Sequence, residues 1–175
     1  YARKTTLHPL ESPQARSFLD SYHIQGFCSG SAYFGLYDNN QLVAVSVWRK
    51  NKNILYLDRY ATSCTVVGGM GKMLKKGKEI ATNSGCTDIV TFSDHSVSNG
   101  NLYENLGFNK DKNLKPDYSY VVKGERKHKF GYRIKKFKQD PQLIYKEGLT
   151  EKELAKLNGL ERIWDCGKTR WVMEV

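Results

Sequence analysis

Cysteine, proline and long apolar runs are all scarce in this sequence. The 175 residues include only four prolines and four cysteines, and no CxxC pair or cysteine–histidine cluster occurs among them. The pattern therefore specifies neither a disulfide framework nor a zinc or other metal site, and reduced thiols in a cytoplasm are expected. No apolar run approaches the roughly 18 residues that span a bilayer, so no membrane association is expected. The chain begins without a methionine or an apolar signal segment, which leaves open that it belongs to a longer protein.

Acidic residues are also few. Lys and Arg number 28 against 18 Asp and Glu, a formal charge of +10, while a hydrophobic content of 39% and an aromatic content of 12% are typical of a folded domain. The excess is concentrated in residues 123–138, where eight basic side chains stand against Glu125 alone, a net charge of +7. Apolar side chains alternate with the basic ones, which favours a strand or extended arm with one basic face.

A basic face of this kind predicts a polyanion as partner, because Lys and Arg near phosphates release condensed counterions and gain affinity for any sequence. We expect DNA, with contacts from Arg126, Lys127, Lys129, Arg133, Lys135, Lys136 and Lys138. The alternative interpretation is a solvated face that only aids solubility. A membrane surface is a weaker explanation, since no amphipathic helix with a bulky apolar face accompanies the charges.

Hydrophobic periodicity and turn residues predict alternating strands and helices. In chain order we expect a strand at 2–10, a helix opening at Ser12-Pro13, a hairpin of 32–38 and 42–50, a strand at 54–62, a helix at 71–84, a buried strand at 88–93, a helix at 99–106 and a strand pair through 118–122. This order predicts an α/β (α+β) fold with a mixed sheet flanked by helices. Residues 1–122 form the main domain in this interpretation.

Residues 123–175 are interpreted as a basic C-terminal extension, because they hold too few apolar side chains to bury alone. After the basic arm, Thr150 and Glu153 form a capping box that begins a short helix. Residues 162–173 are typical of a hairpin that turns at Cys166-Gly167. The extension is therefore expected to consist of an arm, a short helix and a hairpin.

A glycine-rich turn between the strand at 54–62 and the helix at 71–84 is the first candidate site. Its residues are Val66, Val67, Gly68, Gly69, Met70, Gly71 and Lys72. A strand that runs through such a turn into a helix leaves amide donors at the positive end of the helix dipole, where they bind an anion. Glycine lets a pyrophosphate approach the backbone closely, and Lys72 would add charge. Turns of this kind also occur without any ligand.

Residues 96–108 form the second candidate site, a short helix that ends at Gly107 and leads into a strand. Tyr103 lies in this helix, either as a proton donor or as part of its packing face. Two further polar groups are Tyr22-His23, at the end of the first helix, and Asp94, just after the buried strand. His23 and Asp94 would suit a base and its orienting acid, although a lone histidine is more often structural.

The glycine turn and the Tyr103 helix together resemble the acyl-CoA-binding core of the GCN5-related N-acetyltransferase superfamily. In that superfamily a loop of backbone amides holds the pyrophosphate, and a helix of the pattern "N…LYEKLGF" carries a tyrosine that protonates the departing coenzyme A thiolate. The resemblance implies acetyl-CoA or a related acyl-CoA as cofactor at 66–72, and Tyr103 as the acid. A tyrosine suits this step, because its ordinary pKa of about 10 is close to the 8.5 of a thiol. Val66 stands where the superfamily pattern has Arg or Gln.

A closer resemblance, which spans nearly the whole chain, is to a domain of bacteriophage proteins often joined to homing endonucleases of the very-short-patch-repair-like type. It is carried by Asp94 and by residues 1–4, 22–26, 66–69, 101–108, 115–118 and 162–167. More distantly, residues 5–122 are similar to the phage Mom family, which modifies adenine in DNA on an N-acetyltransferase fold. This similarity implies functional roles for Tyr22, His23, Asp94 and Tyr103, with the histidine–tyrosine pair in reversed order here.

Three functions compete at this point. The leading hypothesis is transfer of an acyl-derived group to a flipped-out base amine of DNA, in a host-cell cytoplasm, with the cofactor between the strands at 54–62 and 88–93. The second is a non-catalytic DNA-binding module of a homing endonuclease, with a fused or associated nuclease domain, for which Val66 speaks. The third is an acetyl-CoA-dependent N-acetyltransferase of small molecules or protein amines, against which the +7 stretch speaks.

Overall fold

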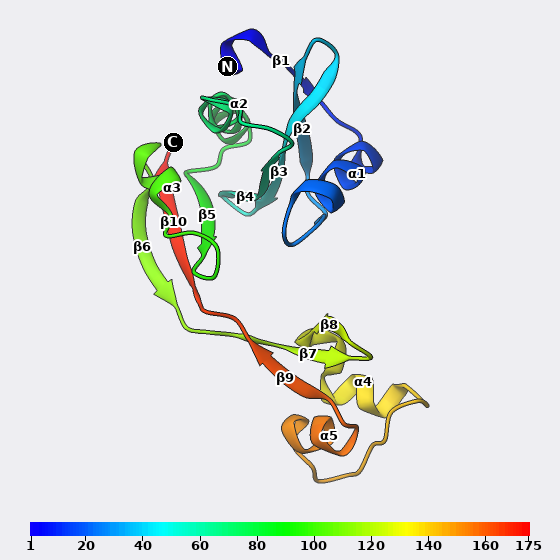
Figure 1. The fold of residues 1–175 in the computed structure, drawn as a ribbon. Coiled ribbons are helices and arrows are strands. Elements are labelled where there is room, and N and C mark those ends of the chain that lie inside the picture. Colours follow the sequence, from blue (N-terminus) through cyan, green and yellow to red (C-terminus); the bar gives the residue numbers. More distant parts are fainter. The chain divides into compact units, whose positions relative to one another are not determined.

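Two β-sheets organise the chain in the computed structural model, which describes all of residues 1–175 (Figure 1). The larger sheet has seven strands in the order β1-β2-β3-β4-β5-β10-β6, and the smaller has three in the order β8-β7-β9. The chain divides into a larger unit, Tyr1–Ser93, Ser98–Lys112 and Thr169–Val175, and a smaller unit, Asp94–Val97 and Asn113–Lys168. The mixed α/β architecture predicted from the sequence is confirmed.

The strands are β1 (Thr6–Pro9), β2 (Ala32–Asp38), β3 (Gln41–Asn51), β4 (Ile54–Thr62), β5 (Asp88–Asp94), β6 (Asn109–Leu114), β7 (Tyr118–Val122), β8 (Glu125–His128), β9 (Glu161–Trp164) and β10 (Lys168–Glu174). The helices are α1 (Ser12–Tyr22), α2 (Gly69–Asn83), α3 (Asn101–Asn105), α4 (Ile134–Gln139) and α5 (Glu151–Leu157), with 3-10 turns η1 (Ala2–Lys4) and η2 (Lys129–Tyr132). Each of these helices is too short or too polar to cross a membrane.

The predicted hairpin of the N-terminal half is confirmed as β2 and β3. Its turn residues Asn39 and Asn40 have φ values of 49° and 67°, the left-handed conformation that a two-residue hairpin turn requires and that asparagine tolerates. Both faces of β3 are buried, because its side chains alternate between two clusters. Val45 and Val47 pack on α1, while Ala44 and Trp48 pack on the α2 side. The two helices therefore cover opposite faces of the larger sheet.

Close packing joins α2 to this sheet. Met70, Met73 and Leu74 of the helix are buried in the same cluster as Trp48. A Cβ atom on Gly77 would lie 2.2 Å from the Trp48 ring, so the indole occupies the space that any other residue would fill. The helix predicted at 71–84 is therefore α2, and its apolar face holds it against the larger sheet.

Strands β4 and β5 are parallel neighbours that pair over only part of their length. The register joins Ile54 to Asp88 and continues as far as Tyr56 with Val90, whereas the strands run on to Thr62 and Asp94. At the same level β4 has a bulge: Trp48 of β3 pairs with Leu57 and Val47 pairs with Arg59. Asp58 is the extra residue, and such a bulge bends and twists its strand. The two strands thus part beyond Val90.

Apart from Asp94–Val97, the smaller unit is a segment inserted between β6 and β10. Its three-stranded sheet packs one face on α4 and α5, with Tyr120, Phe137, Leu154 and Ala155 fully buried between them. The chain leaves and returns at one point, because a Cβ atom on Gly167 would lie 2.7 Å from the Leu114 carbonyl oxygen. With a φ of +82°, Gly167 also needs the conformational freedom of glycine.

Four predicted elements differ from the structure. The strand at 2–10 is η1 followed by β1, and the strand pair through 118–122 is divided, since β6 lies in the larger sheet and β7 in the smaller one. The basic arm is extended only in β8 and continues as η2 and α4, because Phe137 turns into the core of the smaller unit. The hairpin at 166–167 is wrong as well: β9 pairs with β7, while β10 joins the larger sheet. The expected domain boundary, after residue 122, falls between the paired strands β7 and β8.

Candidate active site

The parting of β4 and β5 is the centre of the candidate site. Thr91 is the first residue of β5 beyond the paired stretch, and its Oγ1 donates to the Leu57 carbonyl oxygen over 3.0 Å. The Tyr103 hydroxyl shares a hydrogen bond with Thr91. The phenol of α3 is therefore held at the place where the two strands separate, next to the bulge at Asp58.

Packing and burial define the state of Tyr103. Its ring lies 5.7 Å from Phe108 and 6.2 Å from Trp171 between centroids. Burial raises the pKa of the Tyr103 phenol above its ordinary value, although the hydrogen bond with Thr91 acts in the opposite direction. The hydroxyl consequently keeps its proton at neutral pH. The packing role predicted for Tyr103 is confirmed, while its role as a proton donor stays a prediction.

The turn that leads into α2 presents backbone donors. Gly68 is the N-cap, with a φ of +78° and no side-chain cap. The amides of Val67, Gly68, Met70 and Gly71 have no acceptor within the chain, whereas Gly69 N donates to Val66 O over 2.9 Å. Four unused donors at the positive end of a 15-residue helix are the arrangement that can bind an anion.

Tyr60 closes one side of this turn. A Cβ atom on Gly69 would lie 2.6 Å from the Tyr60 hydroxyl oxygen and 3.0 Å from Val66 Cγ1. Burial raises the pKa of Tyr60 to about 12, so the group stays neutral. The Val66 side chain itself packs against the core cluster. Its apolar character, which departs from the superfamily pattern, therefore serves the interior of the larger unit.

Lys72 holds the N-terminal turn. Its Nζ donates to the Ala2 carbonyl oxygen over 3.0 Å and to the carbonyl oxygen of Thr5, and Ala2 N donates to Val67 O over 2.8 Å. The ammonium is thus engaged by η1, on the side of the loop that the chain itself covers. A contact from Lys72 to a phosphate would require these bonds to be given up.

Tyr22 and His23 lie together at the end of α1. Tyr22 is exposed and its ring lies 4.7 Å from that of Phe18. His23 Nδ1 accepts a hydrogen bond from Gln25 N over 3.1 Å. Burial, with the positive charge of Arg59, lowers the pKa of His23 from 6.5 to about 4, so the imidazole is neutral at pH 7. Its accessible lone pair is already used by the backbone.

Asp94 belongs to the smaller unit. Its Oδ1 accepts hydrogen bonds from Ser96 N over 3.0 Å and from Ser96 Oγ over 2.6 Å. These contacts stabilise the turn that follows β5, as Asp commonly does through its own backbone neighbours. The sequence prediction placed Asp94 correctly at a strand end.

Two groups of the site were missed by sequence reasoning. Thr91 lies within a buried strand, and no local pattern separates it from a packing residue. Asp58 occupies the bulge of β4, and its carboxylate accepts two hydrogen bonds from Arg49, of 2.6 and 2.9 Å. This bidentate pair raises the pKa of Arg49, chiefly through the hydrogen bond. A β-bulge depends on the register between strands, which cannot be inferred from the sequence of one strand.

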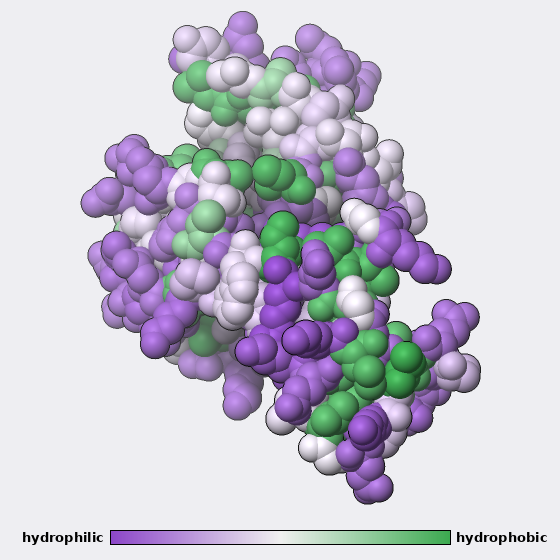
Figure 2. All heavy atoms as spheres, turned by 60° about the horizontal axis from the view of Figure 1, so that its bottom comes forward, coloured by the Kyte–Doolittle hydropathy of each residue, from purple (hydrophilic) through white to green (hydrophobic).

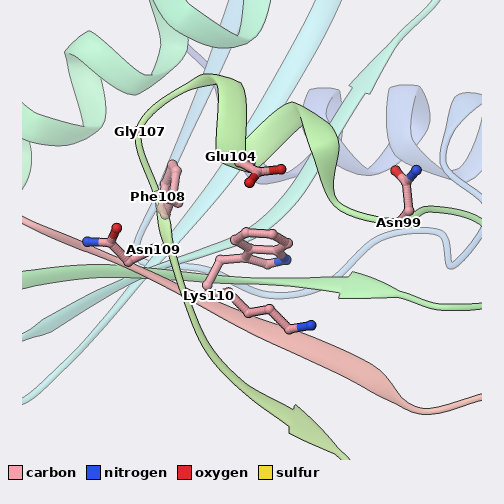
Figure 3. Close-up of a pocket in the computed structure, with 7 residues that line it drawn as sticks. Asn99, Glu104, Gly107, Phe108, Asn109 and Lys110 are labelled. Carbon is pink, nitrogen blue, oxygen red and sulfur yellow. The ribbon is translucent and has the colours of Figure 1, made fainter.

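A hollow of about 480 Å³ adjoins α3 on the side of β6. Figure 3 shows its lining, which comes from α3, the loops on either side of it, β6 and β10: Asn99, Glu104, Gly107, Phe108, Asn109, Lys110 and Trp171. Trp171 Nε1 donates to Ser93 Oγ over 2.9 Å, so the indole is fixed. The hollow is mostly polar, and neither Tyr103 nor Thr91 belongs to its lining.

No protein-family model matches the sequence, and no curated protein does. Solved structures match its fold. The ribosomal-protein-S18-alanine N-acetyltransferase from Escherichia coli aligns with a TM-score of 0.61 and 14% identity over 98% of this chain and 94% of its own. A GNAT family acetyltransferase from Elizabethkingia anophelis with acetyl-CoA bound gives 0.58 and 16% over 98% and 99%. The spermidine/spermine N-acetyltransferase from Vibrio cholerae gives 0.58 and 10% over 99% and 94%.

Proposed function

We propose that the chain, which has the fold of the GCN5-related N-acetyltransferases, transfers an acyl group from acetyl-CoA or a related acyl-CoA to an amine. One observation carries the proposal: the Tyr103 hydroxyl, held through Thr91, lies where β4 and β5 part. The unused amides of the glycine turn at the end of β4 supply the second half of such a site.

The residues present fit acyl-CoA. A diphosphate needs several donors around it, and the amides of Val67, Gly68, Met70 and Gly71 offer four beside a helix N-terminus. Beyond Val90 the facing edges of β4 and β5 are not paired with each other. The carbonyl oxygens of Leu57 and Asp58 accept from Thr91 and Arg59, and the other backbone groups of these edges could pair with an extended amide-containing chain. When bound, acyl-CoA would supply a thioester carbonyl for attack by the amine.

The chain's own contribution to the reaction is a proton donor with a fixed position. Because its pKa is raised by burial, the Tyr103 phenol carries its proton at neutral pH and can give it to the leaving sulfur. Thr91 orients the hydroxyl, and the bulge at Asp58 keeps the strands apart. His23 is neutral with Nδ1 occupied, so we assign it a structural role at the end of α1.

The acceptor that fits best is an amine of a small molecule or of a protein. Structures of the same fold include enzymes named for the S18 alanine of the ribosome and for spermidine and spermine, which supports this class. The basic surface supports a second candidate, a base amine of DNA. Formal charge alone does not separate them, since the larger and smaller units each carry 14 Lys and Arg against nine Asp and Glu.

The test is a titration of the chain with acetyl-CoA by calorimetry, followed by incubation with acetyl-CoA and a panel of acceptors. The panel contains a polyamine, a peptide with a free N-terminal alanine, a lysine peptide and single- and double-stranded DNA. We expect saturable binding and the mass of one added acetyl group on an amine of the first three acceptors. Acetylated nucleosides would move the acceptor to DNA. Absence of both binding and transfer would overturn the proposal.

A further inference from the structure

The basic side chains of residues 123–138 fall into two groups. Four are paired with carboxylates: Lys127 with Glu125, Lys129 with Asp117, Arg133 with Glu151 and Lys136 with Asp140. Four have no carboxylate partner: Lys123, Arg126, Lys135 and Lys138. Ion pairs at a surface largely cancel in the field that a ligand experiences, so the unpaired group carries the positive charge of this stretch.

One face of the three-stranded sheet is open. The register places Ser119 between His128 and Ile163, and Val121 between Arg126 and Glu161. Because cross-strand partners point to the same side, these six residues share a face, which we call the open face. The opposite face carries Tyr118, Tyr120 and Val122 and packs on α4 and α5. Arg126, His128 and Ile163 are exposed, so the open face combines charge with apolar surface.

An exposed aromatic ring extends the open face. Phe130, in η2 directly after β8, is 64% exposed. Its ring lies 4.7 Å from that of His128 in an edge-to-face arrangement, and the Arg133 guanidinium carbon lies 4.9 Å from its centroid. A phenyl ring left in water costs hydrophobic free energy, and here two polar neighbours hold it in place. The chain offers no cover for it within the smaller unit.

We propose that the smaller unit binds single-stranded nucleic acid along the open face. Lys123 and Arg126, at the hairpin of β7 and β8, would neutralise phosphates, and Phe130 would stack an unpaired base. A positively charged surface with an exposed aromatic ring is what a flexible strand of bases and phosphates requires. A duplex hides the faces of its bases, and an acidic peptide has no ring to stack, so both fit less well. Figure 2 shows hydrophobic patches bordered by strongly hydrophilic residues on the surface turned toward the viewer.

The first test measures the contribution of the unpaired charges. The full chain is titrated by fluorescence anisotropy into labelled oligothymidine of about 20 nucleotides, at about 50 to 300 mM salt. Lys123→Glu with Arg126→Glu is expected to weaken binding about tenfold or more and to lower the salt slope by about 1.4, since each single-strand phosphate contributes about 0.7. The matched control, Lys75→Glu with Lys78→Glu on α2, changes the net charge equally and is expected to bind like the wild type.

The second test measures stacking. Phe130→Ala removes an exposed ring and is not expected to affect folding, which circular dichroism checks. We expect a roughly 5- to 150-fold loss of affinity for oligothymidine and no change for a hairpin duplex of the same length. Polyglutamate serves as a competitor that carries charge without bases and is expected to compete weakly.

Several results would overturn the proposal: no binding to oligothymidine, equal loss in the α2 control, an unaffected Phe130→Ala variant, or polyglutamate that competes as well as unlabelled oligothymidine. Each of these results would show that the open face attracts anions through its charge alone and does not bind single-stranded nucleic acid specifically. None of these measurements uses acetyl-CoA or the Tyr103 site. The nucleic-acid proposal and the proposed acyl transfer can therefore fail independently.

Discussion

Tyr103 combines a packing ring with a hydroxyl at the candidate reaction centre, and the two can be separated by a single substitution. Tyr103→Phe keeps the ring contacts with Phe108 and Trp171 and removes only the group that Thr91 orients. We expect kcat to fall about a hundredfold or more while the affinity for acetyl-CoA stays unchanged, because the proton is given in the transition state. Steady-state kinetics and calorimetry measure the two quantities.

Tyr56→Phe is the matched control. Tyr56 lies on β4 within the paired stretch, opposite Val90, and its ring stacks with Arg49 at 4.5 Å. The Tyr56→Phe variant loses a hydroxyl from the same pair of strands but keeps the Thr91 contact of Tyr103. If both variants lost activity to the same small extent, Tyr103 would be a packing residue and not an acid.

His23 makes the stability of the protein depend on pH. Its pKa is 6.5 in the unfolded chain and about 4 in the folded one, so between these values the unfolded state binds more protons. Stability from this group is therefore complete above about pH 6.5 and is lost as the pH falls toward 4. His23→Asn retains an acceptor for Gln25 N and does not titrate. Urea unfolding at several pH values should show a shallower decline for the variant, and identical curves would contradict the assignment.

Some of these residue properties could be read from the sequence and some could not. The pattern around Tyr103 identified its helix, because a tyrosine between Leu102 and Leu106 before Gly107 is local information. Thr91 and the engagement of Lys72 by η1 depend on contacts between residues far apart in the chain. Such contacts leave no trace in a window of neighbouring residues.

The turn before α2 has glycine at position 69 because a larger residue would collide with Tyr60. Gly69→Ala introduces a Cβ atom 2.6 Å from the Tyr60 hydroxyl oxygen, so the turn or the tyrosine has to shift. We expect weaker acetyl-CoA binding by calorimetry, because the amide donors of the turn move with it. Tyr60→Phe removes that oxygen, and the double variant is expected to recover part of the affinity.

The control for the loop is Gly71→Ala. A Cβ atom there would meet nothing closer than Leu106 Cδ2 at 3.7 Å, so binding should be close to that of the wild type. A loss as large as that of Gly69→Ala would show that the first residues of α2 tolerate no side chain at all, and that Tyr60 is not the cause.

Elements with one strong local pattern were predicted well, and elements fixed by tertiary packing were not. The hairpin of β2 and β3 has a polar two-residue turn, and α2 has an apolar stripe. Residues 129–138 instead mix a short alternation with Phe130 and Phe137, one exposed and one buried. Only the core of the smaller unit decides between strand and helix there. The same holds for β9 and β10, which look like a hairpin until their partners are known.

At the scale of the whole molecule, the contact between the two ends of residues 115–166 makes this segment separable. Leu114 and Gly167 are in contact, and neither core cluster of the larger unit contains a residue from 115–166. Replacement of 115–166 by a short glycine-containing turn is therefore expected to leave a cooperatively unfolding protein that still binds acetyl-CoA. Thermal unfolding and calorimetry check this. Loss of the cooperative transition would show that the larger unit needs the insertion to fold.

The place of β10 in the larger sheet also bears on how the protein folds during synthesis. This strand is the sole neighbour that β6 has, and it lies between β6 and β5, yet the ribosome produces it after the entire insertion. Until it emerges, Trp171 and Met173 are missing from the core and β6 is an unpaired edge. The smaller unit can fold first and bring the two ends of its segment together, which removes most of the entropy cost of closing that loop. In the order of translation, the insertion therefore folds before β10 completes the larger sheet and holds the ends of β6 and β10 close together.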